Sequence, residues 1–184
     1  MTLRGPELLG PDHLVGSFDF GKAALNDWLV RRALANQKSG TSRTWVAVDD
    51  PGNRVVAYYA SATASVLRSA ATGRAARNQP EDIPAILLAR LAVDMEYAGQ
   101  GLGAALLRHF ALKAMEVAAV VGARLLLVHA QDGEARQFYL HYGFEPSPID
   151  ELTLMRVITD ISWAVAPEVK SQRVVYEVAV LAST

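Results

Sequence analysis

The sequence contains no cysteine, which excludes a disulfide framework and a thiol nucleophile. Its 4 histidines lack the spacing of metal ligands, so we predict no metal site. No apolar run approaches the roughly 20 residues that a membrane-spanning helix needs. The chain also does not open with a basic stretch followed by an apolar one, as a signal peptide does. We therefore expect a soluble, cytoplasmic protein with no membrane partner.

The net charge is −1, but the charged side chains are unevenly distributed along the chain. Between positions 21 and 80, 9 basic residues face 3 acidic ones, whereas 8 basic and 13 acidic residues follow position 80. The N-terminal half can therefore offer a basic surface to an anion, although an ordinary solvated surface can have the same composition. With 184 residues, of which 51% are hydrophobic, the chain can form one well-packed core.

Residues 88–107 join a strand to a helix through a glycine-rich loop. An apolar run that ends in Leu91-Ala92-Val93-Asp94 predicts a buried strand, and apolar residues spaced by four from Leu102 predict a helix. Gly99-Gln100-Gly101-Leu102-Gly103-Ala104 connects them. Glycine lets the backbone approach a ligand closely, and the start of a helix presents unpaired N–H groups. The loop therefore predicts a binding site for a pyrophosphate.

Two kinds of cofactor could use this loop. A Rossmann dinucleotide site needs the loop directly after the first strand and an acidic residue after the next one. Here four residues separate the loop from Asp94, the loop lies in the second half of the chain, and the next strand ends in Val128-His129-Ala130-Gln131. This arrangement disfavours a dinucleotide.

The rest of the chain predicts helices and strands around this unit. The hydrophobic patterns and turn signals predict a helix over 22–36, an antiparallel hairpin of strands 42–48 and 54–66, an irregular basic segment over 67–79, a helix that ends at Val121, a strand over 123–130, a helix over 131–141 capped by Asp132, and a strand that ends at Ile158. Residues 8–20 predict a short strand or loop, and 173–181 predict one more strand.

Together with Phe138-Tyr139-x-x-x-Gly143-Phe144, this order of elements resembles the coenzyme A half of the GNAT family of N-acetyltransferases. The resemblance implies an α/β (α+β) fold with a central mixed, twisted sheet, splayed at a bulged strand and flanked by helices. It also implies acetyl-CoA as cosubstrate, its pantetheine arm along the strand and its pyrophosphate on the loop amides. The residues implied to bind it are Leu91, Ala92, Val93, Gly99, Gln100, Gly101, Leu102, Gly103 and Ala104. The family usually has Arg or Gln where this chain has Ala98.

The same resemblance assigns roles in acetyl transfer. A backbone N–H near Val93 polarises the acetyl carbonyl, and Tyr139 donates a proton to the sulfur of coenzyme A. The residues themselves show no carboxylate that is needed as a base. An α-amine with a pKa of about 7.7–8.0 is already partly neutral at cellular pH, whereas a lysine side chain has a pKa of about 10.4. An α-amine acceptor is therefore favoured. His129, Glu81 and Asp82 stay open as bases.

Further segments extend the resemblance over the N-terminal half. They are Asn26-Asp27-Trp28-Leu29, Ser42-Arg43-Thr44-Trp45-Val46, Tyr58-Tyr59-Ala60-Ser61-Ala62-Thr63, Arg77-Asn78-x-Pro80, and Ile83-Pro84 ahead of Leu88-Ala89-Arg90-Leu91. From about Leu8 to Val157 the chain resembles the acetyltransferase toxins of bacterial type II toxin–antitoxin pairs. Those toxins acetylate the α-amine of aminoacyl-tRNA, which stops translation.

The toxin resemblance also implies partners. Such toxins bind the tRNA acceptor stem through basic residues, pair as homodimers, and are inhibited by a ribbon-helix-helix antitoxin. The matching basic residues are Arg31, Arg32, Lys38, Arg74 and Arg77. We expect an acetyltransferase domain over residues 1–158 and a C-terminal extension over 159–184 that could add an edge strand.

Two other functions stay open. The first is acetylation of a small-molecule amine or of a protein N-terminus by the same fold. The second is a non-catalytic coenzyme A-binding partner protein, which would have no use for a proton donor at Tyr139.

Overall fold

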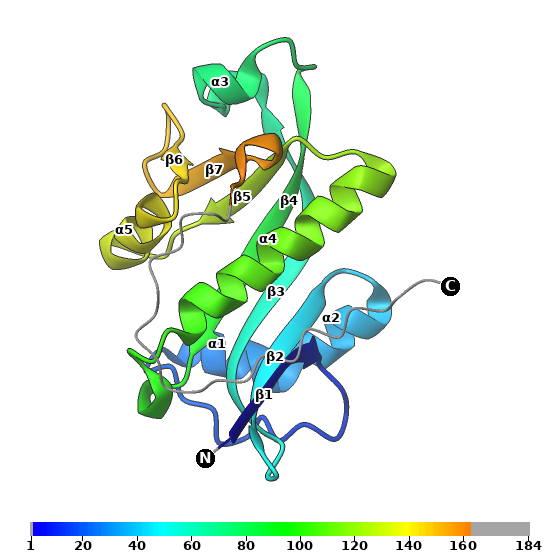
Figure 1. Cartoon of the computed structure of the whole chain (residues 1–184), viewed down its shortest axis with the longest axis vertical. Coiled ribbons are helices and arrows are strands. Elements are labelled where there is room, and N and C mark those ends of the chain that lie inside the picture. The colour runs from blue at the N-terminus through cyan, green and yellow to red at the C-terminus, as the bar shows by residue number, and fades with distance from the viewer. Residues whose placement is uncertain (1, 163–184) are drawn as a thin grey trace.

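The computed structural model describes residues 2–162, which form a mixed seven-stranded sheet with helices on both faces (Figure 1). The strand order is β1-β2-β3-β4-β5-β7-β6, and β4 and β5 are parallel while the other neighbours are antiparallel. The strands are β1 (Thr2–Leu8), β2 (Arg43–Asp50), β3 (Arg54–Leu67), β4 (Asp82–Val93), β5 (Leu125–His129), β6 (Glu145–Pro146) and β7 (Thr153–Val157). The predicted mixed sheet flanked by helices is confirmed.

The helices that were predicted agree with the expected boundaries within a few residues. The helical elements are α1 (Ala23–Trp28), the π-helical segment η1 (Leu29–Ala33), α2 (Leu34–Ser39), α3 (Gly73–Ala76), α4 (Leu102–Val121) and α5 (Gly133–His141), with 3₁₀ turns η2 (Arg68–Ala70), η3 (Met95–Tyr97) and η4 (Ile158–Asp160). The first three follow one another without a break and make up the predicted N-terminal helix. Gly122 ends α4, and the Asp132 side chain accepts the Ala135 N–H (2.9 Å) at the start of α5, as predicted.

Each face of the sheet is covered by its own set of helices. Successive side chains on β3 point to opposite faces, so Tyr59 packs in the core beneath α4 and α5. Tyr58 packs against Trp28, and its hydroxyl donates to the Leu25 carbonyl (2.9 Å) beneath α1. Val66, on the same side of β3 as Tyr58, packs against α3. We call the two sides the α4 face and the α1 face; α1–η1–α2 and α3 cover different ends of the α1 face (Figure 1).

A bulge in β4 opens the sheet at its centre. Ala60 pairs with Arg90 but Ser61 pairs with Leu88, which leaves Ala89 as an extra residue on β4. Up to Leu88 the strand β4 also pairs with β5, whose last partner is Val128. Beyond this point β4 and β5 separate, and the predicted splay at a bulged strand is confirmed. We call the opening between the two strands the gap.

Three parts of the chain differ from the prediction or lie outside it. No strand was predicted before residue 8, where the structure has β1. The segment 67–79, predicted to be irregular, contains the two short helical pieces η2 and α3. Thr72 caps α3 by accepting the Ala75 N–H (3.4 Å). The predicted strand over 173–181 lies outside the described residues. Within residues 2–162, no helix combines the length and the hydrophobicity that crossing a membrane requires.

Candidate active site

The glycine loop presents free backbone N–H groups at the start of α4. Gly99 and Gly101 have φ of 75° and 81°, in the left-handed region that glycine adopts without strain. Gly101 caps α4, and its carbonyl accepts the Ala105 N–H (3.1 Å). The N–H groups of residues 102–104 precede this first helical hydrogen bond and have no acceptor within the helix. A 20-residue helix therefore directs its positive end at this loop, as a bound pyrophosphate requires.

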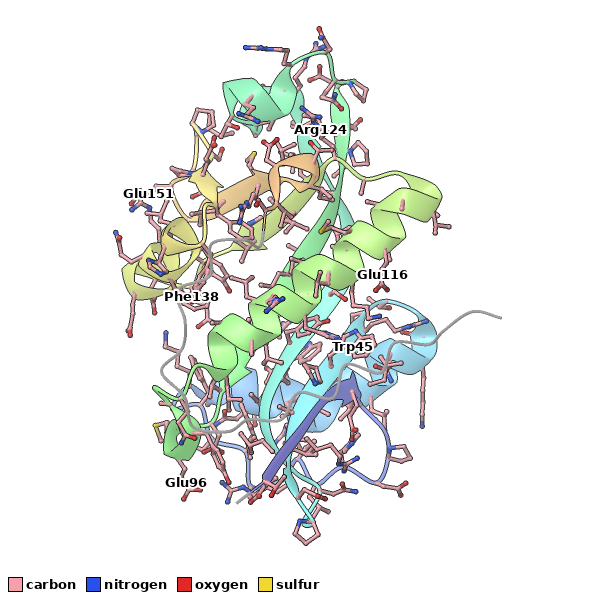
Figure 2. The ribbon with its side chains drawn as sticks, viewed as in Figure 1. Trp45, Glu96, Glu116, Arg124, Phe138 and Glu151 are labelled. Carbon is pink, nitrogen blue, oxygen red and sulfur yellow. The ribbon has the colours of Figure 1, made fainter. Side chains whose placement is uncertain are left out.

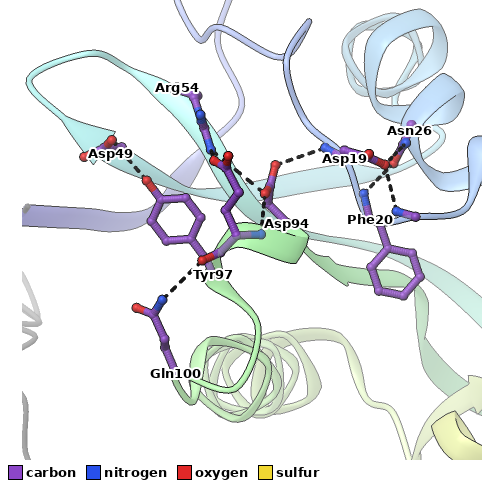
Figure 3. Close-up of polar contacts among 10 residues, drawn as sticks. Asp19, Phe20, Asn26, Asp49, Arg54, Asp94, Tyr97 and Gln100 are labelled. Carbon is purple, nitrogen blue, oxygen red and sulfur yellow. Dashed lines mark hydrogen bonds and ion pairs between the residues drawn. The ribbon is translucent and has the colours of Figure 1, made fainter.

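A buried carboxylate fixes the path from β4 to this loop (Figure 3). Asp94 is 2% exposed and accepts the N–H groups of Glu96 and Asp19, both at 3.0 Å. The first bond caps the turn η3, and the second ties the segment before α1 to the end of β4. The Tyr97 hydroxyl donates to Asp49 on β2 (3.1 Å). The turn that leads into the loop is therefore fixed to β4, to β2 and to the segment before α1.

Beyond the bulge, the backbone of β4 faces the gap at alternate residues. Asp94 donates its N–H to the Val56 carbonyl (2.8 Å), so in this antiparallel pair the hydrogen-bonded positions of β4 include Asp94 and Ala92. The N–H and C=O groups of Leu91 and Val93 consequently point away from β3 and into the gap. Ala92 was also expected to bind acetyl-CoA. Its backbone N–H and C=O instead point toward β3, and its side chain lies in the core beneath α1.

Two aromatic residues of α5, Phe138 and Tyr139, pack in the core of the α4 face. A Cβ added to Gly103 would lie 3.7 Å from the Phe138 ring and 3.9 Å from Leu91 Cδ2, so the loop, β4 and α5 converge there (Figure 2). Tyr139 is 6% exposed and packs edge-on against Phe144. Burial raises the pKa of the Tyr139 hydroxyl, which therefore stays protonated. No hydrogen bond joins this hydroxyl to another described residue, so it is free to donate.

The α1 face of the gap carries positive and polar groups. The Arg90 guanidinium, directly after the bulge, lies 4.3 Å from the centre of the Trp28 ring. Sequence reasoning missed Arg90 as a site residue, because only the bulge aims it toward α1. His129 ends β5 on the same face, since it continues the alternation of Leu125 and Leu127, which pack beneath α3.

An ion pair connects the two sides of the gap at its wide end. Lys22 Nζ lies 2.6 Å from Asp132 Oδ2. Lys22 follows the segment that contacts the end of β4, where Met95 donates its N–H to the Asp19 carbonyl (2.8 Å). Asp132 follows β5. Hydrogen bonding by the Ala135 N–H, and then by Lys22, lowers the pKa of Asp132, so this carboxylate stays ionised.

The five expected tRNA contacts fall into two groups on the α1 face. Arg31 and Arg32 lie exposed on η1, and Lys38 is exposed in the last turn of α2. Arg74 and Arg77 are exposed at α3, at the other end of the sheet (Figure 1). A π-helical turn changes which residues face outward, and the sequence carried no signal for it.

Two arginines of the 67–79 segment have acidic partners that lie outside the segment. Arg74 Nε lies 2.7 Å from Asp160 Oδ2. Arg68 pairs with Glu81 (3.2 Å). Asp160 is more than eighty positions from Arg74, so sequence proximity could not reveal this pair. The positive charge at α3 is therefore partly neutralised.

Of the three candidate bases, two lie far from the gap. Asp82 pairs with Leu67 at the start of β4, seven residues before Ala89 and thus about 23 Å away along the strand. Glu81 precedes it and binds Arg68. His129 alone of the three lies at the gap. In the described part of the chain, no three His, Asp or Glu side chains lie together as a metal site requires.

Comparison with known proteins agrees with this geometry. A family profile described as an acetyltransferase (GNAT) domain matches residues 40–146. A tRNA-acetylating toxin of Mycobacterium tuberculosis is 47% identical over 146 residues, which cover 79% of this chain and 87% of the toxin.

Two solved structures of the toxin AtaT are also similar to this chain. AtaT complexed with acetyl-methionyl-tRNAfMet matches with a TM-score of 0.78 at 27% identity, covering 86% of this chain and 95% of that one. A mutant AtaT bound to the C-terminus of the antitoxin AtaR and acetyl-CoA has a TM-score of 0.70 at 25% identity and covers 86% and 93%.

Proposed function

The chain belongs to the acetyltransferase (GNAT) family, and from this premise we propose that it moves acetyl from acetyl-CoA to the α-amine of aminoacyl-tRNA. Acetylated aminoacyl-tRNA cannot accept a growing peptide, so the enzyme would block translation as the toxin of a toxin–antitoxin pair. The observation that carries the proposal is the gap between β4 and β5, with free N–H groups on its α4 face and cationic side chains on its α1 face.

The donor fits the α4 face. The pyrophosphate of acetyl-CoA would accept hydrogen bonds from the N–H groups of residues 102–104, and the pantetheine amides would pair with the free backbone of Leu91 and Val93. Gly103 leaves room beside Phe138 for this arm. The thioester would then lie in the gap, within reach of Tyr139.

The residues of this chain can supply each need of the reaction. The amine nitrogen attacks the thioester carbonyl carbon, and the negative charge on the carbonyl oxygen is stabilised by the backbone N–H of Val93. When the C–S bond breaks, the Tyr139 hydroxyl gives its proton to the thiolate. The phenolate of Tyr139 then takes a proton from the acylated nitrogen, so that the enzyme is restored.

The acceptor fits the α1 face. The exposed basic side chains at η1, α2 and α3 lie at the two ends of the α1 face and would bind phosphates of the acceptor stem. Phosphate contacts provide affinity without sequence specificity, so the choice among aminoacyl groups would be made at the gap itself. An acceptor that approaches from this face meets the thioester without crossing the cofactor site.

We extend the proposal to the partners and the compartment. The enzyme would act in the cytoplasm, where charged tRNA is used, and would form a homodimer. A ribbon-helix-helix antitoxin would inhibit it by covering the exposed basic side chains of the α1 face. The structure of AtaT with the C-terminus of its antitoxin supports an antitoxin as the partner.

The test is transfer of labelled acetyl from acetyl-CoA to a pool of aminoacylated tRNAs. Uncharged tRNA, free amino acids, small amines and peptides are run beside the pool. We expect label only in the charged tRNAs, and a loss of about 100-fold or more in Tyr139→Phe with unchanged acetyl-CoA affinity. Label in small amines or peptides instead would overturn the tRNA substrate, and unchanged activity in Tyr139→Phe would overturn the role of the tyrosine.

A further inference from the structure

A chain of hydrogen bonds ends at the gap on the α1 face. His129 Nδ1 lies 2.9 Å from Thr153 Oγ1, and this hydroxyl lies 2.7 Å from Asp150 Oδ2. The histidine is the last residue of β5, Thr153 is its partner on β7, and Asp150 precedes β7. The side chain of His129 is exposed to solvent. None of these three residues has a part in the chemistry described above.

The position of His129 places it beside the reacting groups. Leu88 and Val128 are the last paired residues of β4 and β5, so His129 is the first residue of β5 beyond the closed part of the sheet. The bulged Ala89 follows Leu88 on the other strand, and its neighbour Arg90 points to the same face. An amine that reaches the gap from the α1 face therefore passes between Arg90 and His129.

The hydrogen bonds determine which nitrogen of His129 carries the proton. Hydrogen bonds from the Thr153 hydroxyl and the Leu152 N–H lower the pKa of Asp150, so this carboxylate is ionised and only accepts. The single proton of the Thr153 hydroxyl must then point to Asp150. The Thr153 oxygen can only accept from His129, so the proton of the neutral ring is on Nδ1. Nε2 is left with a lone pair.

From this geometry we infer that His129 is the general base of the reaction and that Thr153 and Asp150 are positioning residues for it. The inference rests on the proposed acetylation of an α-amine. A histidine held in one tautomer by a hydroxyl and a carboxylate follows the arrangement of a base that is oriented by a third group. The ionised Asp150 also stabilises the imidazolium that forms when the base is protonated.

The proposed step balances. The acceptor arrives as an ammonium group, and Nε2 of His129 takes one of its protons. The neutral nitrogen then forms a bond to the acetyl carbon, and the C–S bond breaks. A second proton leaves the nitrogen and replaces the one that Tyr139 gives to the thiolate. His129 returns its proton to solvent. The products are the N-acetyl group, the free thiol of coenzyme A and one released proton.

The charged groups on the elements around the gap are Arg90 on β4, Lys22 before α1, Asp132 at the start of α5 and Asp150 before β7. The aminoacyl α-amine has a pKa of about 7.7–8.0, so without a base the reaction depends on the neutral fraction already in solution. With His129 as base, acetyl transfer continues below that pKa. The two cases differ in their pH profiles.

The experiment compares kcat/KM for charged tRNA between pH 6.0 and 8.5 in the wild type, His129→Ala and Thr153→Val. We expect His129→Ala to be about tenfold slower at pH 6.5 and nearly equal to the wild type at pH 8.5, where the amine is neutral. Thr153→Val should show the same trend at about threefold, because Nδ1 loses its partner. His141→Ala, a change of another exposed histidine, should match the wild type throughout.

The outcomes separate the inference from the function on which it rests. If the wild type acetylates no charged tRNA at any pH, the proposed function fails. If the wild type is active and His129→Ala has the same profile, or is slower by one factor at every pH, the inference is wrong and the histidine is structural. Should His129→Ala melt at a lower temperature, His129→Gln and Thr153→Val give the same decision.

Discussion

The α4 face and the α1 face meet at the gap between β4 and β5, and they differ in how the chain builds them. On the α4 face the candidate site comes from two short continuous stretches, the glycine loop and the Phe138-Tyr139 pair, and mainly offers backbone N–H groups and aromatic rings. On the α1 face it comes from side chains scattered over five elements, most of them charged and several paired with distant partners.

This difference follows from what each face would bind. A cosubstrate of constant structure can be held by backbone geometry, which glycine and a helix start provide locally. A tRNA end is large and is held by charges spread over a wide surface. The affinities for acetyl-CoA and for tRNA should therefore be separable by mutation, so that a change on one face leaves the other affinity intact.

The largest effect on binding should come from the loop on the α4 face. Gly101→Val places a branched side chain at φ 81°, which costs about 1–2 kcal/mol. Relief of this strain would turn the N–H groups of residues 102–104 away from the pyrophosphate. We expect about 30-fold weaker acetyl-CoA binding by calorimetry, with unchanged tRNA affinity. Gly122→Val is the matched control, since it has φ of 82° at the far end of the same helix. Equal weakening by both variants would contradict the assignment of the loop.

The second effect should come from the α1 face. The double change Arg32→Ala and Arg77→Ala removes one cation from each basic group, and we expect about tenfold weaker tRNA binding at physiological salt. The slope of log affinity against log salt should fall by about 1 for each arginine. Arg108→Ala, an exposed arginine on α4, is the control. If Arg108→Ala weakens tRNA binding as much, the tRNA does not bind by the α1 face.

A third prediction concerns the core of the α4 face. Burial, and then Lys113, lower the pKa of His109 to about 4, and its Nδ1 lies 2.8 Å from the Tyr59 hydroxyl. The unfolded chain, with an ordinary histidine pKa near 6.5, binds the proton first as pH falls. The contribution of the neutral ring to the free energy of unfolding is therefore fully present above pH 6.5 and is lost as the pH falls toward 4.

The loss should be about 1 kcal/mol, because the ring is partly exposed and solvent screens the effect. Urea unfolding at several pH values measures it. His109→Gln should flatten this part of the curve. A variant curve that falls as steeply as that of the wild type would assign the pH dependence to other groups.

The smallest effect should be a gain. Ala98 is exposed beside the loop, where the family usually has Arg or Gln. Ala98→Arg adds a cation near the phosphates, and we expect about threefold tighter acetyl-CoA binding that disappears at high salt. Ala119→Arg on α4 adds the same charge far from the loop and should change nothing. A gain in both variants would indicate only a general effect of net charge.

The sequence predicted the α4 face better than the α1 face for a physical reason. The end of α4 at Gly122, the cap of α5 at Asp132 and the strand-loop-helix unit are local, because each depends on residues that are neighbours in the chain. The contact of Arg90 with Trp28 and the pair of Arg74 with Asp160 join residues far apart in sequence. No local pattern signals such contacts, and none signals the π-helical turn of η1.

The strand β1 was missed for a related reason. Its sequence has little alternation of apolar and polar residues, and Gly5-Pro6 interrupts it with an irregularity in its pairing to β2. It is an edge strand that the pairing with β2 stabilises, and its own residues have only a weak preference for strand conformation. The bulge at Ala89 was expected only from the resemblance, since the residues around it read as a regular strand.

The most direct test of the account is to identify the atom that receives the acetyl group. Charged tRNA is treated with the enzyme and acetyl-CoA, the ester bond is cleaved with mild base, and the released amino acid is analysed by mass spectrometry. The account predicts an N-acetyl amino acid whose acetyl group is on the α-nitrogen. Acetyl found on a nucleotide, or on a side-chain amine with the α-amine free, would contradict it.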